Sequence, residues 1–213
     1  MIDAEWDREV LGPILARVAT PSPTAIAFHE AGHAVVARGL GVEVHVVSIR
    51  PGEGHLGVAV QGAVGRYDDF DLGPWWEHPL SVTSVARSIT IALAGYVAEA
   101  MVSPSASSTG RPDVSRAAGT EAVAQLSPSD FALLRAAEAE ASPEDDGSAA
   151  WRLAEALTGS VSEAASFLTL MRASTRRLVH ERAEQIAAVA HELLRTVVLD
   201  GRAVDRVINK EIQ

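Results

Sequence analysis

The segment Ala27-Phe28-His29-Glu30-Ala31-Gly32-His33-Ala34-Val35-Val36-Ala37 combines small apolar residues with two histidines. We expect a buried helix that starts after Thr24, as its N-cap, and ends near Gly39 and Gly41. Histidines four residues apart lie one turn apart on the same face of a helix, so their ring nitrogens can converge on one ion. The segment therefore predicts a rigid helix that presents two metal ligands.

The glutamate between these histidines suggests hydrolysis. Glu30 would project beside a zinc ion, where it can accept a proton from a water that zinc activates and pass it to the leaving amine. A chance match on an ordinary helix is the plain alternative. Two further His-Glu pairs, at His180 and His191, lack the second histidine. We interpret those two as exposed faces of a C-terminal helix, and only the first as a catalytic motif.

A catalytic zinc ion normally has three protein ligands and one open position. The chain has no cysteine, so the third ligand must be a histidine, aspartate or glutamate. Glu99, on a following helix, and Asp113, at the start of a later one, are the two candidates. Spacing alone leaves both open.

Composition limits the other function classes. The chain has 213 residues, which fits one domain with extensions, and a net charge of −10. Such a charge without a basic stripe argues against nucleic acid as a partner. No stretch approaches the roughly 20 apolar residues of a membrane helix, and the first residues do not form a signal peptide. We expect a cytoplasmic protein without membrane insertion.

The rest of the pattern predicts a mainly α protein with a small β-hairpin or sheet, an α+β fold. Residues 42–50 and 55–61 are rich in β-branched residues and predict two strands that form a hairpin. An acidic turn is expected at 142–147. Helices are expected at 3–19, 80–102, 113–126, 127–141, 151–157, 162–199 and 204–208, and the long 162–199 region is either one helix or two joined near 172–174.

The sequence resembles the peptidase domain of the FtsH-type ATP-dependent zinc metalloproteases. Four segments carry this resemblance in the same order as in that family. They are residues 27–37, the strand pair Val46–Pro51 with His55–Val58, the helix 89–100 with Leu93-Ala94-Gly95-Tyr96-Val97-Ala98-Glu99, and the loop Ser108-Thr109-Gly110-Arg111-Pro112-Asp113-Val114-Ser115-Arg116-Ala117.

The resemblance implies a role for several residues. Asp113 becomes the third zinc ligand beside the histidines, and Glu99 becomes a supporting residue near the site. Substrate in this family binds as an added strand, which suggests Leu56, Gly57 and Val58 as the residues that meet the peptide.

It also implies an organisation of the chain. We predict an N-terminal helical extension at 1–23 and a metallopeptidase-like domain at 24–213. The domain would divide into a catalytic core at 24–126 and a C-terminal helical bundle at 127–213.

These features together predict an endopeptidase with zinc as its cofactor and a peptide or unfolded protein as its substrate. The family carries an ATPase module before the peptidase domain, but no Gly-x-x-x-x-Gly-Lys loop or apolar 20-mer precedes residue 24. We therefore expect ATP-independent cleavage or a separate ATPase partner, and the resemblance also suggests a homo-oligomer. The alternative is a binding or regulatory module that keeps the metallopeptidase fold without cleaving.

Overall fold

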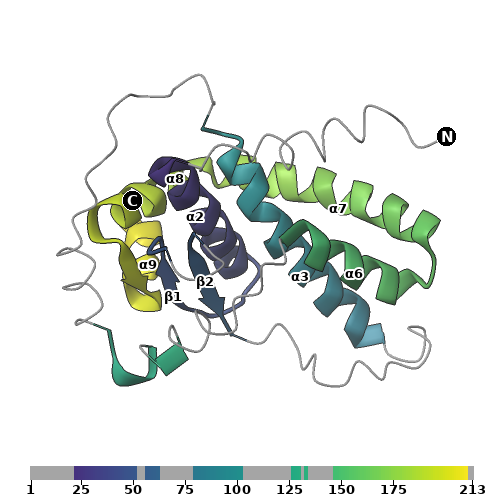
Figure 1. The fold of residues 1–213 in the computed structure, drawn as a ribbon, viewed down its shortest axis with the longest axis horizontal. Helices are drawn as coiled ribbons and strands as arrows, with labels where there is room; N and C mark the ends of the chain where they lie inside the picture. The colour runs from purple at the N-terminus through teal and green to yellow at the C-terminus, as the bar shows by residue number, and fades with distance from the viewer. Residues whose placement is uncertain are drawn as a thin grey trace.

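The computed structural model describes residues 22–51, 56–62, 79–102, 126–130, 132–133 and 146–210. The described part is mainly helical with one small sheet, as the sequence predicts (Figure 1). Its elements, in chain order, are α2 (Pro23–Gly39), β1 (Val44–Ser48), β2 (Val58–Gln61), α3 (Pro79–Glu99), α6 (Asp146–Thr158), α7 (Val161–Glu181), α8 (Ala183–Thr196), β3 (Val198–Asp200) and α9 (Gly201–Lys210). None of the described helices is long and apolar enough to cross a membrane.

The sheet has three antiparallel strands in the order β2-β1-β3. The predicted hairpin is confirmed: Val47 of β1 pairs with Ala59 of β2. On its other side β1 pairs with β3, where Val47 faces Leu199. β2 is therefore an edge strand, and no other described strand pairs with its outer side.

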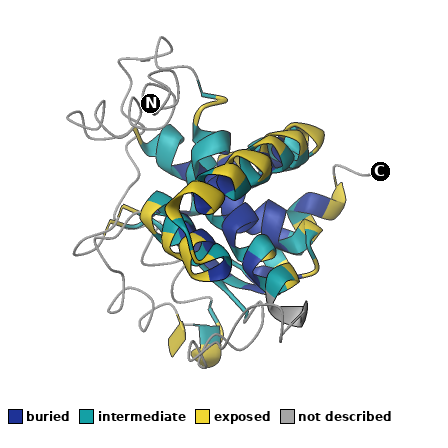
Figure 2. Ribbon diagram, turned by 90° about the vertical axis from the view of Figure 1, so that its right-hand side faces the viewer, coloured by how far each residue is buried: buried dark blue, intermediate teal, exposed yellow. Residues whose placement is uncertain are grey.

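Two clusters of buried side chains hold the helices together. In the first, α2 packs against the sheet, α8 and α9. In the second, α3 packs against α6 and α7. In Figure 1, α3 lies beside α2, and it contributes buried residues to both clusters. Figure 2 shows the buried residues gathered in the centre of the molecule, with exposed residues on its outer helices.

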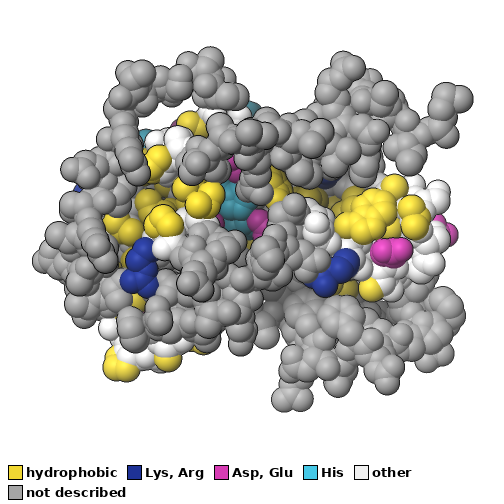
Figure 3. All heavy atoms as spheres, in the orientation of Figure 1, with side chains coloured by type: hydrophobic (Ala, Val, Ile, Leu, Met, Phe, Trp, Pro, Cys, Tyr) yellow, Lys and Arg dark blue, Asp and Glu magenta, His cyan; other side chains and the backbone are white. Residues whose placement is uncertain are grey.

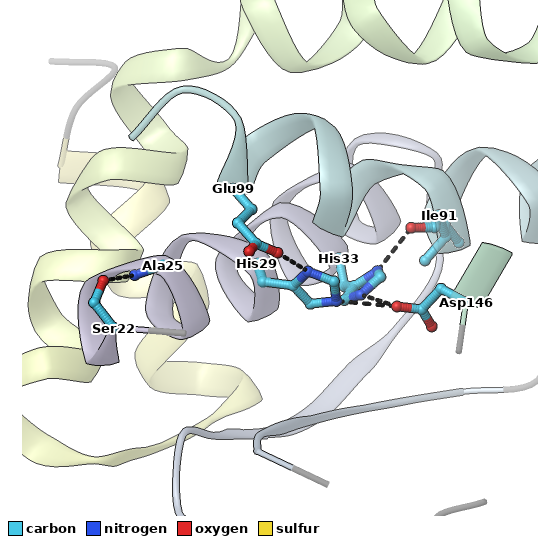
Figure 4. Close-up of polar contacts among 7 residues, drawn as sticks. All are labelled: Ser22, Ala25, His29, His33, Ile91, Glu99 and Asp146. Carbon is cyan, nitrogen blue, oxygen red and sulfur yellow. Dashed lines mark hydrogen bonds and ion pairs between the residues drawn. The ribbon is translucent and has the colours of Figure 1, made fainter. Parts of the chain in front are cut away.

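Helix α2 starts two residues earlier than the sequence suggested. The N-cap is Ser22 and not Thr24: its Oγ accepts a hydrogen bond from the backbone N–H of Ala25 at 3.1 Å (Figure 4). Pro23 occupies the first turn, where its fixed φ suits a helix and its missing N–H has no cost. The helix ends at Gly39, as predicted.

The C-terminal region differs from the predicted pattern in two places. The long helical region is two helices, but they separate at Arg182 rather than near 172–174. This break lets α7 pack on α3 and α6 while α8 packs on α2. Residues 198–200 form a strand instead of the end of a helix, because the chain turns at Val197, with φ of 69°, and then pairs with β1.

The start of α6 also corrects the prediction. Residues 146 and 147 were expected in an acidic turn, with a helix only from 151, yet the helix begins at Asp146. Asp146 is the acidic residue of its first turn, where a carboxylate is favoured by the helix dipole. The predicted helices at 3–19 and 113–126 lie outside the described residues, apart from Leu126.

Candidate metal centre

Helix α2 supplies two histidines to one side of the molecule. His29 and His33 lie one turn apart, with ring centroids 4.7 Å apart and an interplanar angle of 77°. Nine of the eleven residues from Ala27 to Ala37 of α2 are buried. The helix can therefore barely shift in its surroundings, and the two rings start from a fixed backbone. Figure 3 shows histidine side chains beside acidic ones near the middle of one face, with hydrophobic side chains around them.

Helix α3 orients both imidazole rings. The Nδ1 of His33 donates to the backbone carbonyl of Ile91 at 2.7 Å, since a carbonyl can only accept. The Nδ1 of His29 lies 3.1 Å from Oε2 of Glu99. Figure 4 shows that both contacts leave the opposite ring nitrogens, the two Nε2 atoms, directed toward Asp146. A metal-binding histidine is usually fixed through its second nitrogen in this manner.

Helix α6 brings the carboxylate. Oδ2 of Asp146 lies 3.0 Å from Nε2 of His29 and 3.2 Å from Nε2 of His33. Within the described part of the chain, these three residues form the one group of three or more side chains able to hold a metal ion, with ligand atoms all within 4.8 Å of one another.

The geometry suits a tetrahedral ion. Zinc binds imidazole nitrogen and carboxylate oxygen at about 2.0–2.2 Å, so two ligand atoms around a tetrahedral ion lie about 3.4 Å apart. The distances from Asp146 to the two histidines are close to that value. Two imidazoles with one carboxylate are a donor set typical of catalytic zinc, which leaves a fourth position for a reacting group.

His29, His33 and Asp146 stabilise one another's charged forms. Burial lowers the pKa of His29, but hydrogen bonds with Asp146 and Glu99 outweigh it and raise the pKa to about 10. Burial acts in the same way on His33, and Asp146 again raises its pKa. Although burial disfavours its charge, the two histidines hold the pKa of Asp146 well below its usual range. A cation that binds here would therefore compete with protons for the histidine nitrogens.

Glu30 lies beside this group on α2 and is buried. Burial raises its pKa, and the nearby charges of His29 and His33 oppose that rise. A raised pKa suits a carboxylate that accepts a proton near neutral pH. The backbone of Gly57 packs directly on Glu30: a Cβ at this glycine would lie 2.6 Å from Oε1. The segment that leads into β2 therefore touches the glutamate of the motif.

The predicted site residues separate into three groups. His29, Glu30, His33 and Glu99 come together in one place. Gly57 joins them through Glu30, while Val58 begins β2 and Leu56 is exposed. Asp113 lies outside the described residues, so its role as a ligand stays a prediction. The histidines of the two other His-Glu pairs, His180 and His191, are exposed on α7 and α8, as expected.

Sequence reasoning missed Asp146. Its position in a run of acidic residues before Gly147 suggested a turn. One signal could have revealed it. The residues that follow have a helical pattern, with Ala150, Ala154 and Leu157 buried, and acidic residues are favoured at the start of a helix.

Most of the chain matches a known protein family. The model of peptidase family M41 matches residues 17–207. The chain belongs to peptidase family M41. The M41 family is that of the FtsH peptidase domain, so the resemblance seen in the sequence is confirmed, and so is the mainly α fold with a small sheet. Membership of the M41 family implies a metal-dependent peptidase. No curated protein matched the chain.

Proposed function

We propose that this protein is a zinc endopeptidase whose ion is held by His29, His33 and Asp146. The observation that carries the proposal is the convergence of both Nε2 atoms and one carboxylate oxygen, from α2 and α6, on a single point. Zinc, when bound there, would lower the pKa of a water to about 7 and so supply a nucleophile at neutral pH.

The chain's own residues perform the remaining tasks. Glu30 takes the proton of the attacking water on its carboxylate and returns it to the leaving amine. Its burial supports this role, because burial raises the pKa of Glu30 and a carboxylate with a raised pKa is a stronger base. Glu99 and the carbonyl of Ile91 hold the two rings in the orientation that directs Nε2 toward the ion.

The substrate is a peptide or an unfolded protein segment in extended form. The outer side of β2 is available for an added strand among the described elements, and Gly57 at its start contacts Glu30. A peptide paired along Leu56, Gly57 and Val58 would therefore pass close to the reacting groups. A folded substrate offers no free backbone for such pairing, so an unfolding partner, such as a separate ATPase, would extend the range of substrates.

The test compares Glu30→Gln with wild-type protein in a peptide-library and casein cleavage assay, together with metal analysis. We expect one zinc per chain in both proteins and cleavage only in the wild type. Glu163→Gln, an exposed position at the start of α7, is the matched control and should cleave normally. Zinc in both proteins and cleavage in neither would instead support a binding or regulatory module.

The third ligand needs its own comparison, because the family resemblance points to Asp113 and the geometry points to Asp146. We expect Asp146→Asn to lose tight zinc binding and Asp113→Asn to retain it. The opposite result would assign the ligand to Asp113. Calorimetric titration of zinc into protein stripped with a chelator separates the two.

A further inference from the structure

Gly95 lies in the middle of α3, directly opposite the two histidines. A Cβ built at this residue would lie 2.7 Å from Nε2 of His29 and closer still to Nε2 of His33. Those are the two nitrogens that face Asp146. The missing side chain of Gly95 therefore corresponds to the space beside the ligand atoms.

The neighbours of Gly95 along α3 show why the helix comes so near. Ile91 and Glu99 lie one turn before and one turn after it, on the same face of the helix. Both contact the histidines, through the Ile91 carbonyl and the Glu99 carboxylate. A helix that orients both rings from positions 91 and 99 must present residue 95 between them, so that residue has no room for a side chain.

Another glycine near the site shows a different relation. A Cβ at Gly32 would meet Cβ of Ala98 and the backbone carbonyl of Ala94, so Gly32 allows α2 and α3 to approach each other. The nearest atoms to a Cβ at Gly95 are instead ring atoms of His29 and His33. Alanine is the better helix former, so local helix stability does not favour glycine at either position.

We propose that Gly95 is a positioning residue that keeps the α3 side of the metal centre clear, so that His29 and His33 can direct their Nε2 atoms onto one ion. The inference rests on the proposed zinc site and adds a requirement to it. One face of α3 therefore does two things: it orients the rings through Ile91 and Glu99, and it leaves space for them at Gly95. A methyl group there would force the rings to turn, and their Nε2 atoms would no longer converge.

The experiment is zinc titration of the full chain carrying Gly95→Ala, after removal of metal with a chelator. We expect this variant to lose zinc binding at the site while its circular dichroism spectrum stays that of the wild type. Gly39→Ala is the matched control: it is the same substitution in a helix, and the three atoms nearest to its methyl all belong to the guanidinium of Arg182, at the end of a flexible side chain. The control should bind zinc as the wild type does.

A second measurement covers the case in which Gly95→Ala unfolds the protein. We would compare its effect on Tm in wild type and in a His29→Ala/His33→Ala background, both without metal. Because the methyl contacts those rings, the substitution should lower Tm in the wild type and leave it unchanged or raised in the double variant. An equal loss in both backgrounds would mean that Gly95 serves helix packing alone and would overturn the proposal.

Zinc binding by the wild-type protein and by the variant tests the metal site and the role of Gly95 separately. If wild-type protein binds no zinc, the proposed function fails. If wild-type and Gly95→Ala proteins bind zinc with the same affinity and stoichiometry, the proposed function stands and the role of Gly95 is refuted.

Discussion

Helices α2 and α6 both contribute to the metal centre, but the protein holds them differently. Nine residues of α2 are buried, between the sheet, α8 and α3. In α6 three residues are buried, Ala150, Ala154 and Leu157, and they pack in the second cluster against α3 and α7. The histidines thus belong to the main core, whereas Asp146 sits on the first turn of a helix in the smaller cluster.

This difference indicates which part of the site is preformed. The positions of His29 and His33 follow from the packing of the main core, which also fixes α3 against α2. The position of Asp146 depends on how firmly α6 rests on α3. Bound metal would join the two parts directly, so zinc affinity should report on the docking of α6, and zinc should stabilise the second cluster more than the first.

The largest expected effect comes from a pair of core truncations, Leu193→Ala in α8 and Leu157→Ala in α6. Each removes a buried leucine and should cost about 2–5 kcal/mol of unfolding free energy, as measured by urea denaturation. Their zinc affinities should differ. Loosening α6 lowers the fraction of molecules with Asp146 in place, which weakens apparent binding in proportion. Equal zinc affinities in the two variants would contradict the division into two parts.

Gly57→Ala tests the position of Glu30, which lies on α2 in the preformed part of the site. The new methyl would lie 2.6 Å from Oε1 of Glu30, and Glu30 is buried with little room to give way. A displacement of about 1 Å in a reacting group can cost on the order of 10²-fold in rate, so kcat/KM should fall by that order while zinc stays bound. Gly62→Ala, after the far end of β2, meets its nearest atom at 3.3 Å and should be nearly neutral. Similar kinetics for both variants would rule out the contact as functional.

Much of the preformed part of the site was predictable from the sequence, because its residues lie close together along the chain. His29, Glu30 and His33 lie within one and a half turns of a helix, so their relation follows from helical geometry alone. Asp146 is 117 residues from His29 and reaches it only through the packing of α6 on α3. β3 escaped prediction similarly, because its pairing with β1 is a tertiary contact that overrides the local helical pattern. Glu99 was placed near the site by the family resemblance, and its hydrogen bond is seen only in the structure.

Glu99→Gln sharpens the role of α3 in the preformed part. The amide keeps the size of the side chain but removes the charge that holds His29 through Nδ1. Loss of such an orienting partner typically weakens metal binding about 10–100-fold, which a competition titration with a chelator would measure. The control is Glu192→Gln on α8, where the carboxylate pairs with Arg195 instead of a histidine. Equal zinc affinity in the Glu99 variant and the wild type would remove Glu99 from the site.

The smallest effect concerns pH. The pKa of His29 is raised from 6.5 to about 10 in the folded protein, so the charged form is favoured by folding. Its contribution to the stability of metal-free protein is complete below pH 6.5 and is lost as the pH rises toward 10. The Tm difference between wild type and His29→Ala should shrink over that range. Zinc affinity should rise with pH over the same range, because fewer protons then compete for the ligands. A Tm difference that grows with pH would refute the assignment.

The most direct test of the metal centre is a crystal structure with anomalous diffraction at the zinc absorption edge. We expect one zinc ion at about 2.0–2.2 Å from Nε2 of His29, Nε2 of His33 and a carboxylate oxygen of Asp146. An ion held by the two histidines and Asp113, with Asp146 turned away, would contradict it, and so would a crystal soaked in zinc with no ion between α2 and α6.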